Sequence, residues 1–193
     1  DSPYYLFCDQ DDIWVETKVE KCYLEIKKTE ETNKDLPILV ATDAKVVDSD
    51  LKVINTSFWA YTKVKPAILI KKHYLQVFNF APGCTMMFNR ALKKMLNPIP
   101  ENILMHDWWL LILAERHGVI KTIDESLILY RQHSSNTLGA NAVDENYFLA
   151  KFKNLRNVIA SQQQHLQFLK EIKGLSKFNY YWIKLVYNLN RLK

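Results

Sequence analysis

Three carboxylates stand close together near the start of the chain, at Asp9, Asp11 and Asp12. They follow an apolar stretch from Tyr4 to Cys8, and apolar residues resume at Ile13. This pattern predicts a buried strand that ends in an acidic turn. Clustered carboxylates at a strand end repel one another unless a cation joins them, which predicts a site for Mg²⁺ or Mn²⁺. A solvated acidic turn that caps the next helix fits the same residues.

Composition and charge define the class of protein around this turn. The 193 residues are 48% hydrophobic, which is enough for a real core in one domain or most of one. The cysteines Cys8, Cys22 and Cys84 lack zinc-type pairing, which indicates a reducing, cytoplasmic environment. Residues 151–193 carry nine Lys or Arg and one acid, Glu171, so this basic tail and the acidic body are expected to do different work.

Alternating strand and helix patterns must position the acids. Apolar residues from Val15 to Ile26 recur at helical spacing, with Lys18 assigned to the wet face, and this helix is expected to end near Asn33. A second buried strand, 38–42, should end at Asp43. The later patterns predict a turn at 48–50, an ambiguous segment at 61–80, a loop at 81–85, a strand at 86–88 and a helix at 90–96. The apolar run 108–114 predicts a helix of about three turns that Gly118 ends, and strands follow at 119–123 and 127–131.

The sequence after residue 145 predicts helices that differ from the earlier ones in the spacing of apolar residues and in their content of aromatic and basic residues. Apolar residues from Phe148 to Leu169 alternate steps of four and three, and Gly174 should break that helix. The last helix, 178–189, mixes aromatic residues with Lys and Arg as interfacial helices do. Peripheral membrane contact through residues 145–193 explains this mixture better than nucleic acid, for which no motif is present. Docking on the chain's own domain and self-association into a homo-oligomer are the alternatives.

Several stretches, in the same order, resemble the motifs of family 2 glycosyltransferases, especially the bacterial rhamnosyltransferase-like branch. The resemblance spans about residues 1 to 140, and an ordered set of motifs is far more specific than one D-x-D. It implies an α/β fold of the GT-A, Rossmann-related type with a mixed sheet, and residues 141–193 as a helical appendage. The matching stretches are Phe7 to Trp14; Thr42-Asp43-Ala44 with Val47-Asp48; Gly83-Cys84-Thr85-Met86 with Phe88-Asn89-Arg90; His106-Asp107-Trp108-Trp109; and Tyr130-Arg131-Gln132-His133 with Asn136.

The resemblance implies sugar transfer from a nucleotide diphosphate to a hydroxyl. Asp11 would bind the metal that bridges the diphosphate, Asp9 would lie near the ribose, and Asp12 would support the metal ligands. Asp107 matches the catalytic acidic position, usually preceded by Glu where this chain has His106. It would accept the acceptor hydroxyl's proton while that oxygen attacks the anomeric carbon. Asp before a helical run is also a favoured N-cap, and the two roles can coexist.

Three further polar residues have both a functional and a structural interpretation. His133 resembles a histidine that completes the metal site or contacts the diphosphate, although a lone His is commonly an ordinary polar residue. Arg131 could contact phosphate or simply pair with a carboxylate. Asp43 could contact the donor or merely end a strand.

The remaining candidates are expected at the pocket for the sugar and the acceptor. A glycine lets backbone approach a ligand closely, and tryptophans can form a wall for sugar rings. The alternatives are a tight turn for the 83–85 segment and ordinary core packing for the tryptophans. These candidates are Gly83, Cys84, Thr85, His106, Trp108 and Trp109.

Members of the family carry roughly a hundred residues of βα units before the D-x-D. We therefore expect this chain to be a fragment, a truncated gene product or one half of a split protein, and we do not expect the 193 residues to suffice for catalysis. The leading hypothesis is a metal-dependent, inverting glycosyltransferase that uses dTDP-rhamnose or a UDP-sugar. It would extend a cell-surface polysaccharide or lipid-linked acceptor at the cytoplasmic membrane face. A non-catalytic module that binds membrane or a partner is the alternative; a metal-dependent phosphatase fits less well, because the acidic string lacks the expected Thr.

Overall fold

A computed structural model describes residues 2–132 and 155–191 of the chain. The strands are β1 (Tyr4–Leu6), β2 (Ile13–Trp14), β3 (Ile38–Val47), β4 (Val53–Asn55), β5 (Met86–Asn89) and β6 (Val119–Arg131). The helices are α1 (Lys18–Thr32), α2 (Phe58–Tyr61), α3 (Pro66–Lys71), α4 (Arg90–Lys94), α5 (His106–His117), α7 (Leu155–Glu171) and α8 (Lys177–Arg191), with a 3₁₀ turn, η1, at Gly83–Thr85.

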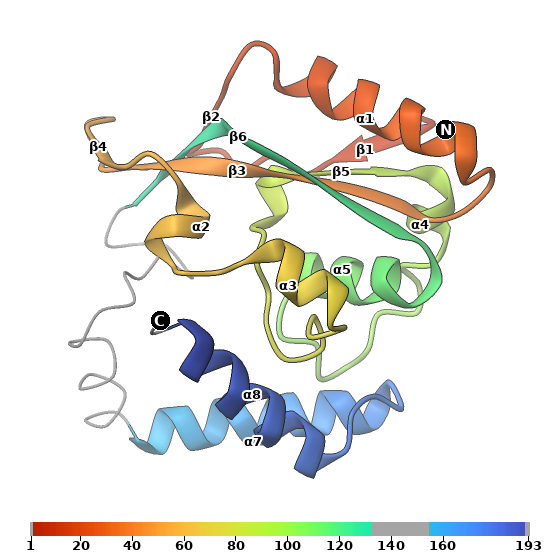
Figure 1. Cartoon of the computed structure of the whole chain (residues 1–193), viewed down its shortest axis with the longest axis vertical. Coiled ribbons are helices and arrows are strands. Elements are labelled where there is room, and N and C mark those ends of the chain that lie inside the picture. Colours follow the sequence, from red (N-terminus) through yellow and green to blue (C-terminus); the bar gives the residue numbers. More distant parts are fainter. Residues whose placement is uncertain (1, 133–154, 192–193) are drawn as a thin grey trace.

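The elements form layers around one twisted sheet (Figure 1). Helix α1 covers one face, α2, α3 and α5 lie on the other, and the α7–α8 hairpin is the layer farthest from α1. The predicted α/β class is therefore confirmed. No helix within 2–132 or 155–191 combines the length and apolarity that a membrane crossing requires.

The sheet is mixed, with the order β1-β5-β3-β6-β2 and with β4 paired to β3. Strands β3 and β6 run parallel, and the other pairs are antiparallel. The two strands predicted at 119–123 and 127–131 are one continuous strand, because pairing with β3 continues past register shifts on both sides of Asp43. Strands β1 and β2 lie at opposite ends of this order, so the segment 7–12 connects the two edges of the described sheet.

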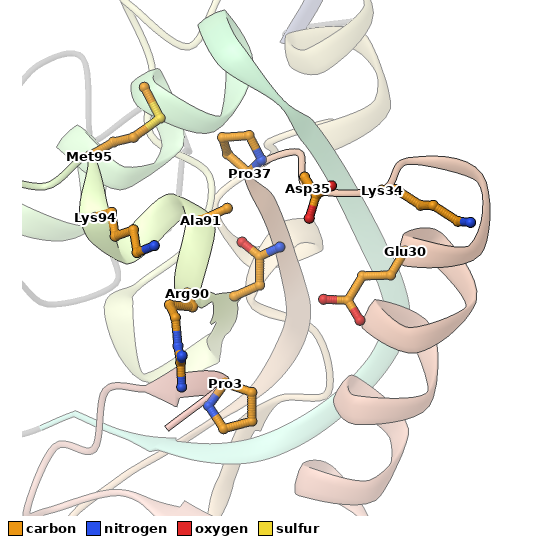
Figure 2. A pocket seen from close by; sticks show the side chains of 10 residues that line it. Pro3, Glu30, Lys34, Asp35, Pro37, Arg90, Ala91, Lys94 and Met95 are labelled. Atoms are coloured by element: carbon orange, nitrogen blue, oxygen red, sulfur yellow. The ribbon is translucent and has the colours of Figure 1, made fainter. Parts of the chain in front are cut away.

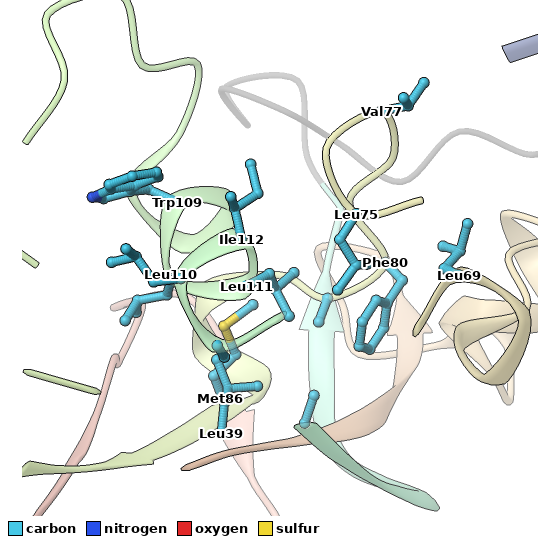
Figure 3. Close-up of a cluster of buried hydrophobic side chains, with 14 of the residues drawn as sticks. Leu39, Leu69, Leu75, Val77, Phe80, Met86, Trp109, Leu110, Leu111 and Ile112 are labelled. Carbon is cyan, nitrogen blue, oxygen red and sulfur yellow. The ribbon is translucent and has the colours of Figure 1, made fainter. Parts of the chain in front are cut away.

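Apolar side chains fill both sides of the central strand β3. Leu39 belongs to the larger core between the sheet and the α3–α5 side, together with Met86 and Leu111 (Figure 3). Its neighbours Ile38 and Val40 join the smaller core beneath α1. A strand buried on both faces reads as a continuous apolar run, which is why the sequence pattern identified it. Each fully buried side chain of this kind contributes about 1.5–3 kcal/mol to folding.

Helix α1 has the predicted end, with Asn33 as its C-cap, but the prediction for its wet face is wrong at Lys18. Lys18 is fully buried in line with Cys22 and Ile26, while Val19 and Tyr23 are 46% and 42% exposed. The buried positions recur every four residues, so they form one stripe against the sheet. The long methylene stem of a lysine can occupy such a stripe.

The basic tail packs on the domain. Phe168 of α7 and Tyr180 and Tyr187 of α8 are buried members of the larger core. The predicted break at Gly174 is confirmed, since α7 ends at Glu171 and α8 begins at Lys177. The early part of the predicted helical seam, including Phe148, lies outside the described residues.

Candidate functional site

Two carboxylates and a thiol converge where the 7–12 segment meets η1. One carboxylate oxygen each of Asp9 and Asp12 and the Sγ of Cys84 all lie within 4.8 Å of one another. Asp9 is exposed, Asp12 is half-buried and Cys84 is fully buried. The cluster therefore opens to solvent on the Asp9 side and closes on the Cys84 side.

Asp12 has one oxygen without a protein partner. Its Oδ1 accepts a hydrogen bond from the backbone N–H of Arg131 at 2.9 Å, whereas its Oδ2 is buried and has no hydrogen-bond partner among the described residues. Burial raises the pKa of Asp12, and the negative charges of Asp11 and Asp9 add to the rise. A buried oxygen left unsatisfied is costly, and a bound cation would remove that cost.

The donor set fits a hard divalent cation held by carboxylates. Burial, together with the nearby Asp12 and Asp9, raises the pKa of the Cys84 thiol far above its usual range. Without a bound metal the Cys84 thiol is therefore protonated, so the two carboxylates are the hard donors of this cluster. Asp9 and Asp12 remain as oxygen ligands of the kind that Mg²⁺ and Mn²⁺ take, with water or phosphate completing the coordination.

The structure does not test the predicted metal pair of Asp11 and His133. Asp11 is not among the clustered ligand atoms, and its backbone carbonyl accepts a hydrogen bond from Nε of Arg131 at 2.8 Å. His133 lies outside the described residues. Arg131 also donates from Nη1 to the carbonyl of Ser49 at 2.9 Å. Through its bond to Asp11, Arg131 connects the acidic turn to the end of β6.

Asp107 lies in the first turn of α5 and faces η1. Its Oδ2 accepts a hydrogen bond from the backbone N–H of Gly83 at 3.0 Å, and its Oδ1 accepts one from the N–H of Trp108 at 2.6 Å. Met105, rather than Asp107, is the N-cap, so the predicted capping role is wrong. Burial raises the pKa of Asp107 and the charge of Asp9 adds a smaller rise, while the N–H groups of Trp108 and Gly83 and the nearby His106 oppose it.

Gly83 allows η1 to approach α5 closely. A Cβ at this position would lie 3.3 Å from the Cβ of Asp107, 3.4 Å from the Phe7 ring and 3.6 Å from the His106 ring. The Phe7 and His106 rings meet edge to face, with their centroids 4.8 Å apart. These contacts connect the acidic turn, η1 and the start of α5 in one packed unit.

The predicted tight turn at 83–85 is confirmed, and its side chains are buried. Thr85 donates from Oγ1 to the carbonyl of Pro82 at 2.7 Å, which closes the turn. Gly83 and Thr85 are buried, like Cys84 between them. Contact of these three residues with a sugar or acceptor stays a prediction.

The two tryptophans contact helix α7. Trp108 donates from Nε1 to the carbonyl of Leu75 at 2.6 Å, and its ring meets His165 edge to face. Trp109 is 8% exposed and packs against Phe168. The core alternative accounts for Trp108 and for the packing of the Trp109 ring, whereas the buried Nε1 of Trp109 has no hydrogen-bond partner among the described residues. A sugar-binding wall stays a prediction.

Both carboxylate oxygens of Asp43 serve the start of helix α2. Its Oδ1 accepts hydrogen bonds from the N–H groups of Ala44 at 2.8 Å and Trp59 at 3.1 Å, and its Oδ2 accepts one from the Ser57 hydroxyl. Asp43 is also buried, in the middle of β3 rather than at its end. These contacts give it a structural task; contact with a donor stays a prediction.

Sequence reasoning missed Lys18 as a part of this site. Its Nζ lies 3.6 Å from the centroid of the Trp14 ring and has no hydrogen-bond partner among the described residues. Burial lowers the pKa of Lys18, while Cys22, Cys84, Cys8 and Asp12 oppose the lowering. A cation is thus buried beside the acidic turn. The available signal was its place four residues before Cys22 and eight before Ile26, on the buried stripe of α1.

A separate cavity of about 830 Å³ lies between the end of α1 and the start of α4 (Figure 2). Charges of both signs line it, including Glu30, Lys34, Asp35, Arg90 and Lys94. None of the clustered residues around Asp9 and Asp107 belongs to its lining. The cavity is therefore distinct from the candidate site.

The fold and site together define an α/β protein with clustered carboxylates at an acidic turn and a buried carboxylate at a neighbouring helix start. No family model matches the chain. Over 165 residues it is 27% identical to the dTDP-rhamnosyl transferase RfbG of Shigella flexneri, an alignment that covers 79% of this chain and 49% of that protein. The chain thus spans about half the length of this relative. The similarity supports a glycosyltransferase-like relationship.

Proposed function

We propose that the chain is part of a metal-dependent, inverting glycosyltransferase of family 2, with a GT-A fold, that transfers rhamnose or a similar sugar from a nucleotide diphosphate. The acceptor would be a hydroxyl of a glycan or a lipid-linked saccharide. The main support from the structure is that Asp107 contacts Gly83, while Asp9 and Asp12 lie beside Cys84, the next residue of the chain. The similarity to a rhamnosyltransferase supports the same reaction class.

Asp107 is the proposed proton acceptor. The N–H groups of Gly83 and Trp108 hold its two oxygens, and each oxygen keeps a lone pair for a further hydrogen bond. A raised pKa makes a carboxylate a stronger base, which suits removal of the acceptor hydroxyl's proton as that oxygen attacks. The position in the first turn of α5 fixes the carboxylate on a rigid element.

Asp9 and Asp12 are the proposed metal ligands, in place of the predicted Asp11 and His133 pair. A bound Mg²⁺ or Mn²⁺ would neutralise charge on the departing nucleotide diphosphate. The Arg131 N–H orients Asp12, and the exposed side of Asp9 leaves room for phosphate. Because the chain spans about half of its relative, we propose that the rest of a longer protein supplies most of the nucleotide pocket.

The test is transfer of rhamnose from dTDP-rhamnose by the chain in its full reading frame, with Mn²⁺ present. Asp107→Asn should lower kcat by about 10²–10⁴-fold, because a general base contributes that much, and should leave the donor KM nearly unchanged. Asp12→Asn should raise the Mn²⁺ concentration needed for half-maximal rate. Asp50→Asn is the matched control, since Asp50 is an exposed turn residue.

Full activity of Asp107→Asn and of Asp12→Asn would refute both assignments. A wild-type protein that folds but transfers no sugar from any nucleotide sugar offered would favour the non-catalytic alternative. Circular dichroism of each variant separates loss of chemistry from loss of folding.

A further inference from the structure

Helix α8 carries apolar residues on two opposite faces. Tyr180, Ile183 and Tyr187 are buried against the domain. The opposite face is exposed, with residue exposures from 40% to 76%, and its members recur at spacings that keep them on one side of a helix. This exposed stripe consists of Phe178, Tyr181, Trp182, Leu185 and Leu189.

One cation is placed directly beside the exposed stripe. Lys177 lines a shallow hollow of about 450 Å³ together with four members of the stripe. The other two cations of α8 follow it at intervals of seven residues, close to two helical turns, but they contact the domain side of the helix. Lys184 donates to the hydroxyl of the buried Tyr180, and Arg191 donates to the carbonyls of Lys63 and Thr62.

Acidic residues are nearly absent from this layer. Within 155–191 the single acid is Glu171, and its carboxylate accepts hydrogen bonds from the backbone N–H groups of Glu101 and Asn102. Lys170 and Lys173 are exposed on either side of it. The surface around the stripe is therefore positively charged, and a partner that covers it must carry negative charge.

We propose that the exposed stripe docks on an anionic lipid surface, with α8 lying in the plane of the interface. Tryptophan, tyrosine and phenylalanine beside lysine suit the boundary between headgroups and acyl chains. Helix α8 belongs to the layer farthest from α1 (Figure 1), and the side chains of the stripe are exposed. A second copy of the chain fits less well, because every charged residue of α8 is a cation and pairing would bring like charges together.

Vesicle flotation tests this docking with the full chain. Phosphatidylcholine vesicles that also contain phosphatidylglycerol should bind the protein at least about tenfold more tightly than phosphatidylcholine alone, since each basic residue near an anionic surface contributes about fivefold. Phe178→Ser combined with Trp182→Ser and Leu185→Ser should reduce binding to the mixed vesicles by at least about tenfold, because three apolar side chains no longer enter the interface.

The matched control replaces three equally exposed apolar residues elsewhere, Leu24→Ser, Val53→Ser and Ile159→Ser, which are 57%, 49% and 48% exposed. Unchanged circular dichroism in both triple variants keeps the comparison valid, and the control should bind mixed vesicles like the wild type. Equal binding by the stripe variant and the control overturns the proposal. The proposal is also overturned if the wild type does not bind the mixed vesicles but forms a dimer at high concentration. Light scattering would detect that dimer, and the stripe variant would fail to form it.

Discussion

The backbone N–H of Gly83 donates to Oδ2 of Asp107 across 3.0 Å, and no side chain separates the two residues. This contact joins the turn before β5 to the first turn of α5, and it holds the proposed base beside the acidic turn.

Gly83→Ala should destabilise the fold by about 1–3 kcal/mol, because a Cβ would press on Asp107 and Phe7 at 3.3–3.4 Å and these neighbours must give way. Urea denaturation measures the loss. Gly118→Ala is the comparison and should cost more, since its Cβ would lie 1.8 Å from the carbonyl oxygen of Pro37, which is backbone and cannot rotate aside. Equal stability of the two variants would contradict this account of the packing.

Lys18→Met should raise the free energy of unfolding by about 1 kcal/mol near neutral pH. Burial lowers the pKa of Lys18, because the folded state disfavours the charged ammonium that is fully hydrated in the unfolded chain. The free energy of unfolding therefore falls as the pH drops below the pKa of an ordinary lysine. The lost contact with the Trp14 ring offsets part of this gain. Lys21→Met, on the exposed side of the same helix, should change stability by no more than about 0.5 kcal/mol. A marked loss of stability in Lys18→Met would show that its attraction to the acidic turn outweighs its burial.

His165 should make the wild type lose stability as the pH falls from about 6.5 to about 4. Burial lowers the pKa of His165 from 6.5 to about 4, so the unfolded chain takes up a proton first within that range. The loss amounts to up to about 3 kcal/mol. His165→Phe should lower the free energy of unfolding by about 1 kcal/mol, because the hydrogen bond to the carbonyl of Gln76 is lost. The free energy of unfolding of this variant should also depend less on pH between about 6.5 and 4.

Urea denaturation at a series of pH values measures both profiles. The exposed His117→Phe is the control and should keep the wild-type slope. A His165→Phe profile as steep as that of the wild type would remove His165 as the cause.

Manganese affinity should distinguish the carboxylates of the acidic turn. Asp9→Asn and Asp12→Asn should each weaken Mn²⁺ binding by at least about tenfold, because each removes a proposed ligand, whereas Asp11→Asn should have a smaller effect. Titration followed by electron paramagnetic resonance measures free Mn²⁺ directly. The opposite ranking, with Asp11→Asn the most damaging, would restore the assignment that the sequence resemblance implied.

Local patterns predicted the elements well where burial was uniform. Strand β3 was visible because its residues are apolar on both faces, and Gly174 marked the break between the tail helices. The wet face of α1 was wrong because Lys18 was assigned by its charge, although its spacing from Cys22 and Ile26 puts its stem on the buried stripe. The strand β6 was divided in two because its middle residues are polar, although pairing with β3 bridges them.

The candidate site was predictable in its acids but not in its grouping. Spacing identified Asp9, Asp11 and Asp12 together, yet which carboxylates converge depends on the path of the chain between two sheet edges. The alternative of core packing for Trp108 depended on α7, a helix distant in sequence. Cys84 beside Asp12 is likewise a tertiary contact without a local signal.

The short segment 7–12 is tethered at both ends, by Leu6 paired with Met87 and by Ile13 paired with Leu129. Its length is therefore as consequential as its composition. Removing a single residue, such as Gln10, would shift the register of one of these two strand pairs by one residue. If the β2–β6 pair shifts, the side chains of Ile13 and Trp14 turn to the opposite face of the sheet.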